Sequence, residues 1–197
     1  MNINGIIIAA GYSKRLGMFK PLAPFKESTF IECIINKLNP FCESIVVVSG
    51  FNNQLLKEKL SINNYKKFLI IYNKNFDKGM FSSIQKGISQ NKNSDWFLIH
   101  QVDQPGLPKV FYKEFITNID DKHNWIQPKY NERKGHPILV KKETAELIIE
   151  EDINSNLRVV SNNTKVNKKI WDCNYKEILQ DIDTKEDYQE LLNPPGN

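Results

Sequence analysis

The sequence predicts an α/β fold with a mostly parallel central sheet. The first observation is a set of short, continuous apolar runs rich in β-branched residues, which are typical of strands covered on both faces. These runs are residues 6–10, 44–49, 68–72 and 96–100. The second observation is a helical pattern after each run. Strands that alternate with helices favour a parallel sheet, because each crossover helix returns the chain to start the next strand in the same direction.

The helices that separate these strands are predicted from the spacing of apolar residues. They are expected around residues 31–38, 55–60, 84–88 and 108–119. The first has apolar residues at i, i+3, i+4 and i+7, on one helix face. The second stripe, Leu55, Leu56 and Leu60, is shorter. Pro108 begins the last pattern, and proline favours a first helical turn because the N–H group that it lacks has no partner there.

The second half of the chain is less regular but continues the same kinds of element. Strands are expected at residues 125–128, 137–140 and 166–173, and a helix at 143–150. Thr184 followed by Asp187 has the form of a capping box, which predicts the start of a last helix. Residues 194–196 (Pro-Pro-Gly) are expected to end that helix.

Length and charge limit the class of protein. With 197 residues, the chain is expected to form one domain over residues 1–197. Lys and Arg total 27 and Asp and Glu total 23, so the formal net charge is 27 − 23 = +4. This mild charge suits a protein that handles phosphates. Without a dense basic tract, it argues against a nucleic-acid partner.

Cysteine usage and hydropathy indicate where the protein works. Cys33, Cys42 and Cys173 are scattered and odd in number, which favours a reducing compartment over a disulfide framework. No apolar run approaches the ~20 residues of a membrane span. The first residues lack the basic start and long apolar stretch of a signal peptide. We therefore expect a cytoplasmic protein with no membrane partner.

The segment after the first expected strand has the composition of a phosphate-binding loop. Its glycines, serine and cations are Gly11, Ser13, Lys14, Arg15, Gly17 and Lys20. Glycines let backbone N–H groups approach phosphate oxygens, and cations neutralise those oxygens. A P-loop would need glycine where Leu16 stands, and a dinucleotide fingerprint would need it in place of Ser13. Pro21 and Pro24 stop an α-helix from starting directly behind the loop. Composition alone leaves a phosphate loop and a plain surface turn both open.

Three carboxylates are candidate metal ligands. Asp103 follows the strand at residues 96–100, at the end where ligands bind in open α/β sheets. It would either hold Mg²⁺ together with substrate phosphates or cap the turn before Pro105. Asp181 and Asp183 alternate along an extended segment, so only one of them is expected to face a metal. The other would support the loop or the cap of the last helix.

Two further positions have a functional and a structural interpretation. His136 lies between Gly135 and Pro137, and a lone histidine is more typical of a packed or hydrogen-bonded residue than of a catalyst. The hydroxyls of Ser82 and Ser83 would bond either a nucleobase or a ribose.

Five segments in order resemble the signature of the nucleotidyltransferases that share a Rossmann-like fold with sugar-phosphate pyrophosphorylases. They are Ala9-Ala10-Gly11-x-Ser13-x-Arg15-x-Gly17-x-x-Lys20, Gly79-Met80-Phe81-Ser82-Ser83-Ile84-x-x-Gly87, Asp103-Gln104-Pro105, Gly135-His136-Pro137 and Asp181-Ile182-Asp183-Thr184. Within that group, the chain most resembles the molybdenum cofactor cytidylyltransferases and their relatives. The resemblance implies a Rossmann-like three-layer sandwich of the nucleotide-diphospho-sugar transferase type, with a mostly parallel central sheet.

The resemblance also implies an activity and the residues for it. A phosphate on the acceptor would attack the α-phosphorus of a nucleoside triphosphate, and pyrophosphate would leave. The implied residues are Arg15 and Lys20 for catalysis, Ala9, Ala10, Gly11, Ser13 and Ser83 for the nucleotide, His136 and Arg158 for the second substrate, and Asp103 and Asp183 for Mg²⁺. Asp183 is favoured over Asp181 by the resemblance alone.

The choice of nucleotide and acceptor depends on finer features. Relatives that use CTP tend to have Ala-Ala-Gly where GTP users have Ala-Gly-Gly, and this chain has Ala9-Ala10-Gly11. A side chain at position 10 would fill space near the base and favour a pyrimidine. The expected acceptor is molybdopterin bearing molybdenum, with a possible hand-off of the product to a molybdoenzyme.

One departure from the family keeps other functions open. The family usually carries Gly-Asp-x-Gly-Ala-Arg before its last strand, whereas residues 153–158 keep only the arginine, Arg158. The alternatives are guanylyl transfer to the same cofactor, cytidylyl transfer to a sugar or polyol phosphate, and a non-catalytic module that only binds nucleotide. A basic RNA-binding protein is disfavoured, because the chain has no aromatic-basic repeat.

Overall fold

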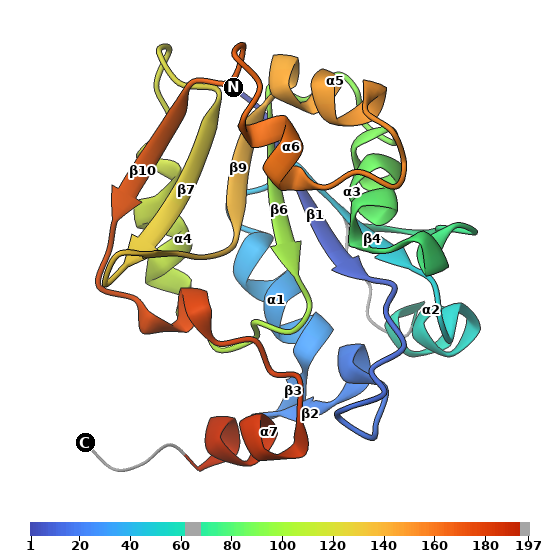
Figure 1. The fold of residues 1–197 in the computed structure, drawn as a ribbon. Helices are drawn as coiled ribbons and strands as arrows, with labels where there is room; N and C mark the ends of the chain where they lie inside the picture. Colours follow the sequence, from blue (N-terminus) through green and yellow to red (C-terminus); the bar gives the residue numbers. More distant parts are fainter. Residues whose placement is uncertain (62–67, 194–197) are drawn as a thin grey trace.

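A large mixed sheet covered by helices forms the centre of the molecule (Figure 1). The computed structural model describes residues 1–61 and 68–193. The strands are β1 (Ile3–Ala9), β2 (Pro24–Phe25), β3 (Ser28–Thr29), β4 (Ser44–Ser49), β5 (Phe68–Tyr72), β6 (Trp96–Gln101), β7 (Trp125–Tyr130), β8 (Arg133–Lys134), β9 (Ile138–Lys141) and β10 (Lys168–Asp172). The α-helices are α1 (Phe30–Leu38), α2 (Asn53–Ser61), α3 (Met80–Ile88), α4 (Lys109–Ile116), α5 (Lys142–Glu150), α6 (Leu157–Ser161) and α7 (Lys185–Leu192). Three short 3-10 helices are η1 (Lys20–Leu22), η2 (Phe76–Lys78) and η3 (Lys176–Leu179).

The sheet is mostly parallel, as predicted. Its strand order is β10-β7-β9-β6-β1-β4-β5, with β8 paired to β7 outside this path. The pairs β6–β1, β1–β4, β4–β5 and β7–β10 are parallel. β9 is antiparallel to both of its neighbours, so it runs against the other strands of the path. Because β1 is central, the loop that follows it opens at the middle of the sheet edge.

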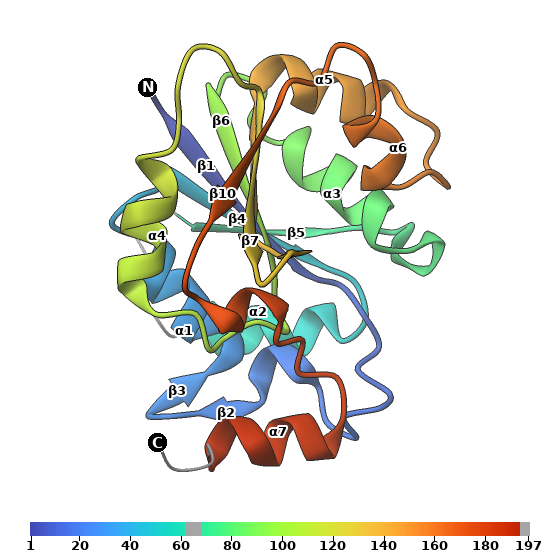
Figure 2. The same cartoon turned by 60° about the vertical axis from the view of Figure 1, so that its left-hand side comes forward.

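Helices cover both faces of the sheet, which gives the expected three layers (Figure 2). Alternate residues of β1 belong to two separate apolar cores: Ile7 packs with α1, α2 and α4, and Ile6 packs with α3 and α5. Every residue of β1 is buried, which explains its continuous apolar run. No helix in residues 1–61 and 68–193 is long and apolar enough to cross a bilayer.

Most elements expected from the sequence are present. The four strands and four helices of the first half are confirmed within a few residues at either end. The capping box at Thr184 is also confirmed: its side chain accepts from the Asp187 N–H at 3.1 Å, and the Asp187 carboxylate accepts from the Thr184 N–H at 2.7 Å. The proposed end of that helix at residues 194–196 lies outside the described residues.

Two expectations for the first half are wrong. β5 is not covered on both faces: Leu69 is 50% exposed and Tyr72 47%, because β5 is an edge strand of the sheet. In α2, Leu55 is exposed, whereas Leu56 and Leu60 are buried, so only these two form the buried stripe. The apolar run of β5 therefore reflects strand propensity together with partial burial, since Ile71 is buried and Phe68 and Ile70 are partly buried.

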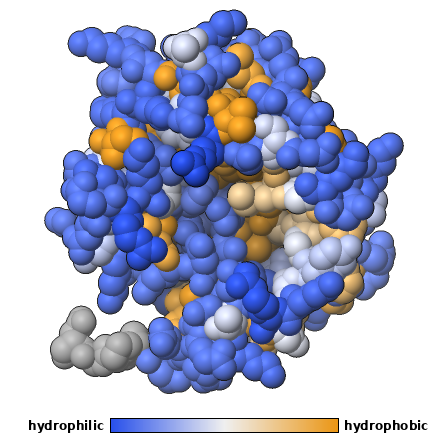
Figure 3. All heavy atoms as spheres, viewed as in Figure 1, coloured by the Kyte–Doolittle hydropathy of each residue, from blue (hydrophilic) through white to orange (hydrophobic). Residues whose placement is uncertain are grey.

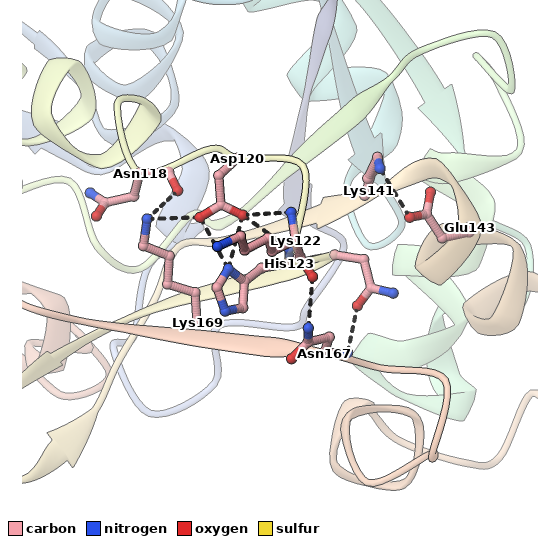
Figure 4. A network of polar contacts seen from close by, with 9 residues as sticks. Asn118, Asp120, Lys122, His123, Lys141, Glu143, Asn167 and Lys169 are labelled. Carbon is pink, nitrogen blue, oxygen red and sulfur yellow. Dashed lines mark hydrogen bonds and ion pairs between the residues drawn. The ribbon is translucent and has the colours of Figure 1, made fainter.

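A group of polar contacts fastens the loop before β7 to the outer strand β10 (Figure 4). The Asp120 carboxylate accepts from the backbone N–H groups of Lys122 and His123, both at 3.0 Å. It also contacts Nδ1 of His123 at 2.9 Å and accepts from Nζ of Lys169, on β10, at 3.1 Å. The hydrogen bond with His123 lowers the pKa of Asp120 most, so the carboxylate stays ionised and the contacts persist at neutral pH.

One glycine lets α3 pack closely on the sheet. A Cβ atom on Gly87 would lie 2.5 Å from a side-chain carbon of Ile6 in β1 and 3.0 Å from one of Val48 in β4. Any side chain here would push α3 away from the two central strands. The position of α3 matters for function, because the first turn of this helix borders the cleft at the sheet edge.

We expect Gly87→Ala to destabilise the protein by about 1–3 kcal/mol, the usual effect of overpacking a core. Alanine in a helix normally stabilises by up to ~1 kcal/mol relative to glycine, so a loss would show that the close contact outweighs helix propensity. Urea unfolding would measure the change. Gly106→Ala is the matched control, because a Cβ there meets its nearest atom at an ordinary 3.5 Å. Equal stability of the two variants would contradict the prediction.

Candidate active site

A cleft opens at the carboxyl ends of β1 and β6, where ligands bind in open α/β sheets. We call it the strand-end cleft. It is lined by Ile8, Ala9, Ala10, Gly11, Tyr12, Ser13, Lys20, Pro21, Phe76, Asp77, Gly79, Met80, Ser83, Gln101, Val102 and Asp103. Figure 3 shows a hollow with partly apolar walls and a hydrophilic rim on this face of the molecule. The cleft combines an apolar floor with charged groups at one side, as a nucleotide requires.

The loop after β1 is held in shape by its own hydrogen bond. The Lys20 N–H donates to Oγ of Ser13 at 3.0 Å, which closes residues 13–20 into a turn. Ser13 itself has φ +56° and Gly17 has φ +76°, both in the left-handed region. The short 3-10 helix η1, with Pro21 in its first turn, follows in place of an α-helix, as the prolines predict. The loop therefore presents Lys20 to the cleft in a fixed direction.

Four predicted residues from three distant segments form one charged group, which we call the charge cluster: Arg15, Lys20, Asp103 and Asp183. Nζ of Lys20 lies 2.7 Å from Oδ1 of Asp183 and 3.6 Å from Oδ2 of Asp103. Arg15 donates to Oδ2 of Asp183 at 2.8 Å. The Lys20 side chain is only 9% exposed, so it is buried between the two carboxylates. Such a cation needs these partners, because an unpaired buried charge is costly.

Burial dominates the electrostatics of Asp103. It raises the pKa of this carboxyl to about 6; Lys20 opposes the shift, and Asp181 and Asp183 add to it. Burial also acts to raise the pKa of Asp183, but hydrogen bonds and charge from Lys20 and Arg15 outweigh it, so the net pKa is lowered. At neutral pH both groups are ionised. The ionised form is less favourable for Asp103, whose pKa is raised, than for Asp183, whose pKa is lowered.

The two carboxylates of the cluster fit a divalent cation. Oδ1 of Asp103 is buried and has no hydrogen-bond partner among the described residues. One or two carboxylates together with substrate phosphates are a usual way to hold Mg²⁺. No group of three or more His, Cys, Asp or Glu side chains in the described part of the chain forms a ready-made metal site. Asp181 is used elsewhere, because its Oδ1 accepts from the Gln104 amide at 2.8 Å.

Several cleft residues were not predicted from the sequence. Tyr12 and Phe76 form an aromatic wall, with ring centroids 5.3 Å apart, and Tyr12 also packs on Phe51 at 5.3 Å. Aromatic residues carry no spacing that distinguishes a cleft wall from a core, so the sequence gives no signal for them. Asn73, just after β5, is buried beneath the cleft and donates to both Ser82 and Ser83 at 3.0 Å.

A second pocket adjoins the first and contains the remaining predicted residues, His136 and Arg158. We call it the basic pocket. It is lined by Met80, Trp125, Gln127, Lys134, His136, Asn156, Leu157, Arg158, Ser161, Asn162 and Lys168. Met80 lines both pockets, so the two spaces meet at the start of α3. None of the lining residues is acidic.

His136 is held without charge at the inner side of the basic pocket. Burial lowers the pKa of His136, with Asp181 opposing the shift, so the ring is neutral at pH 7. Its Nδ1 is buried and has no partner among the residues that the structure describes. Such an orphaned nitrogen is a hydrogen-bonding group available to a ligand. Arg158, on α6, contributes positive charge to the same space.

The structure thus divides the predicted residues between two adjoining spaces. Ala9, Ala10, Gly11, Ser13, Lys20, Ser83 and Asp103 line the strand-end cleft. Asp183 contacts the cleft residue Lys20, and Arg15 pairs with Asp183. His136 and Arg158 lie in the basic pocket. The carboxylates of Asp181 and Asp183 have different partners, Gln104 for Asp181 and Lys20 for Asp183.

The chain has an α/β fold of the nucleotide-diphospho-sugar transferase type. The chain belongs to the MobA-like NTP transferase domain family, whose model matches residues 5–167. It is 29% identical to the molybdenum cofactor cytidylyltransferase of Escherichia coli K12, over 94% of this chain and 93% of that protein. It is 28% identical to a probable molybdenum cofactor guanylyltransferase of Bacillus cytotoxicus, over 97% and 96%. It is also 25% identical to the nicotine blue oxidoreductase of Paenarthrobacter nicotinovorans, over 96% of each chain.

Solved structures show the same fold at low sequence identity. Rv0371c from Mycobacterium tuberculosis H37Rv matches 99% of this chain and 100% of its own, with a TM-score of 0.82 and 15% identity. A CMP:2-keto-3-deoxy-manno-octonic acid synthetase complexed with CTP matches 97% of each chain, with a TM-score of 0.78 and 11% identity.

We expect Asp103→Asn to stabilise the metal-free protein at pH 7 by about 1–3 kcal/mol, since each pKa unit corresponds to about 1.4 kcal/mol. The folded pKa of Asp103, about 6, lies above its ordinary value of 3.8. The unfolded state therefore releases the proton first, and wild-type stability falls as the pH rises through this window. Urea unfolding in EDTA at pH 4 and pH 7 would measure it. If Asp103→Asn were more stable than wild type by the same amount at both pH values, or no more stable at either, the raised pKa of Asp103 would be contradicted.

Proposed function

We propose that this protein is a nucleotidyltransferase that moves a CMP group from CTP to the phosphate of molybdopterin and releases pyrophosphate, with Mg²⁺ as its metal. The observation that carries the proposal is the charge cluster at the strand-end cleft, next to a basic pocket that contains no acid. The acceptor is suggested by the names of the relatives, which act on the molybdenum cofactor. We place the reaction in the cytoplasm.

The proposed chemistry needs no general base. A phosphate monoester is largely dianionic at pH 7, because its second pKa is ~6, so the attacking oxygen already carries charge. What the enzyme must supply is position and charge neutralisation. The cleft matches this need, since its ionisable groups are cations and carboxylates rather than a nucleophile paired with a histidine.

The charged residues and the loop after β1 have proposed roles. Lys20 and Arg15 would bind the triphosphate and stabilise the charge that develops on the leaving pyrophosphate. The backbone N–H groups around Gly11 and Ser13 would cradle phosphate oxygens. Asp103 and Asp183 would hold Mg²⁺, which would neutralise phosphate charge when bound. The structure of Rv0371c complexed with manganese, which shares this fold, is consistent with a divalent metal.

The charge cluster is self-neutral before substrate arrives. Asp183 accepts from both Lys20 and Arg15, so two cations and two carboxylates balance one another in a partly buried site. A triphosphate would draw the cations towards its own oxygens, which frees Asp183 for the metal. The site is therefore preorganised without a large excess charge.

The basic pocket is proposed as the acceptor site. Arg158 would pair with the acceptor phosphate, and neutral His136 would hydrogen-bond the acceptor. Lys134 and Lys168 add positive charge. Because Met80 lies between the two spaces, an acceptor phosphate in this pocket would approach the nucleotide near the first turn of α3.

The base is proposed to be cytosine because Ala10 places a methyl group in the cleft. Guanylyl transfer to the same cofactor is the second candidate, favoured by the guanylyltransferase relative at nearly equal identity. Transfer to another small phosphate and nucleotide binding without catalysis are the remaining alternatives. One relative of nearly equal coverage is named as an oxidoreductase, so sequence similarity at this level does not by itself fix the reaction. A hand-off of the product to a molybdoenzyme would follow cofactor synthesis.

We expect pyrophosphate release when the protein, Mg²⁺, molybdenum-loaded molybdopterin and CTP are combined, and much less with GTP, UTP or ATP. A clear preference for GTP would replace cytidylyl with guanylyl transfer. Binding of a nucleotide without release in any mixture would contradict transfer to this acceptor. A panel of sugar and polyol phosphates would then separate another acceptor from a binding module.

We expect Lys20→Ala to lower turnover by at least about 10²-fold, the typical loss when a group that stabilises transition-state charge is removed. Lys14→Ala is the matched control, because Lys14 is on the same loop but lies over the Tyr12 ring, 4.9 Å from its centroid. Circular dichroism would verify that both variants fold. Near-normal turnover in Lys20→Ala would remove Lys20 from the mechanism.

A further inference from the structure

The amide of Asn73 lies beneath the strand-end cleft and contacts two serine hydroxyls at once. Asn73 follows the edge strand β5 and is only 3% exposed. Its Nδ2 lies 3.0 Å from Oγ of Ser82 and 3.0 Å from Oγ of Ser83, both in the first turns of α3. A single buried side chain thus contacts consecutive hydroxyls on the helix that borders the cleft.

The direction of these hydrogen bonds is fixed by the backbone. The Asn75 N–H donates to Oδ1 of Asn73 at 3.0 Å. A backbone N–H is only a donor, so the atom that faces it must be the amide oxygen, and the NH₂ group must face the serines. Both NH₂ hydrogens are then donated, and both serine oxygens act as acceptors towards Asn73.

The two serines differ in where their own protons go. Ser82 donates its proton to a backbone carbonyl, since the oxygens of Asn75 and Gly79 both lie 2.8 Å from its Oγ. Ser82 does not line the cleft, so its hydroxyl is fully used inside the protein. Ser83 lines the cleft, and its hydroxyl proton has no acceptor among the described residues.

We propose that Asn73 is a positioning residue that makes Ser83 a hydrogen-bond donor directed at an acceptor atom of the nucleobase. This inference rests on the proposed nucleotide binding in the cleft. Because Asn73 occupies a lone pair of the Ser83 oxygen, the hydroxyl proton is left for the ligand. The cleft therefore selects a base that presents an oxygen or an unprotonated ring nitrogen at this point.

The nucleobase is the favoured ligand group because of what surrounds Ser83. The cations and carboxylates of the charge cluster come from the loop after β1, the end of β6 and the segment before α7. Ser83 and the neighbouring lining residue Met80, both on α3, are uncharged, and the charged lining residue that most closely precedes them in the sequence, Asp77, is an anion. A neutral donor beside an anion and away from the cations suits a base better than a phosphate, which the cations of the charge cluster would hold.

An isosteric change at Asn73 reverses the hydrogen bond. In Asn73→Asp at pH 8, the carboxylate still accepts from the Asn75 N–H but now also accepts from Ser83. The lone pairs of the Ser83 oxygen then face the base acceptor. We expect Ser83→Ala to weaken CTP binding about three- to tenfold, the usual net worth of one hydrogen bond. Asn73→Asp should weaken it more, because it replaces an attraction with a repulsion.

The double variant Asn73→Asp/Ser83→Ala distinguishes this relay from a merely structural role. With no hydroxyl left to reverse, it should bind CTP as Ser83→Ala does, and more tightly than Asn73→Asp alone. A double variant whose loss is the product of the two single losses would overturn the proposal. If the aspartate variant does not fold, Asn73→Ala replaces it: this change frees the Ser83 hydroxyl to rotate, so its effect on CTP binding should vanish when Ser83→Ala is already present. Ser82→Ala is the matched control and should bind within about twofold of wild type.

Isothermal titration calorimetry with CTP, GTP, UTP and ATP, each with Mg²⁺, supplies the readout. Ribose and triphosphate are common to all four, so contact with the base predicts unequal losses, largest for CTP. A uniform loss would mean that Ser83 contacts ribose or phosphate, and would overturn the proposal. Binding needs no acceptor, so a protein that binds nucleotide but never releases pyrophosphate would contradict the transferase and leave this test valid.

Discussion

The site depends on one buried cation. Lys20 lies between Asp103 and Asp183. Lys20 is on the loop after β1, Asp103 follows β6, and Asp183 comes just before α7. Neighbouring backbone contacts strengthen the junction, because the Ile182 N–H donates to the Asp103 carbonyl at 2.9 Å. Without Lys20, two carboxylates would face each other in a site of low polarity, where repulsion between them is strong. The same interaction therefore joins three segments and gathers the charged groups of the cleft.

Charged and uncharged side chains lie on different sides of the cleft. Ionised groups gather beside the loop after β1, whereas α3 offers the neutral hydroxyl of Ser83 and the exposed side chain of Met80. A nucleoside triphosphate has the same division, with a charged tail and a nearly neutral base. Because α3 packs closely on β1 and β4, the distance between the charged and the uncharged side of the cleft is fixed. A ligand must therefore fit both sides at once.

Local sequence patterns predicted the long strands and most of the helices, but not α6, the short strands β2, β3 and β8, or the features that depend on neighbours in space. Continuous apolar runs were sufficient for β1, β4 and β6, whose residues are buried on both faces. The edge position of β5 and the reversed direction of β9 are set by sheet order, which no local pattern encodes. The charged residues were found because the motifs of a known family carry them. Asn73 was missed because a single asparagine after a strand looks like any turn residue until its partners are known.

The family model ends at residue 167, yet Asp183 lies beyond it. The carboxylate that holds both Lys20 and Arg15 is thus supplied by the last part of the chain. Synthesis proceeds from the amino terminus, so the central sheet strands emerge well before this segment. Until it docks, the loop cations Arg15 and Lys20 have no Asp183 to bind. The order of synthesis therefore means that the charged site can be complete only after the central strands that support it have been made.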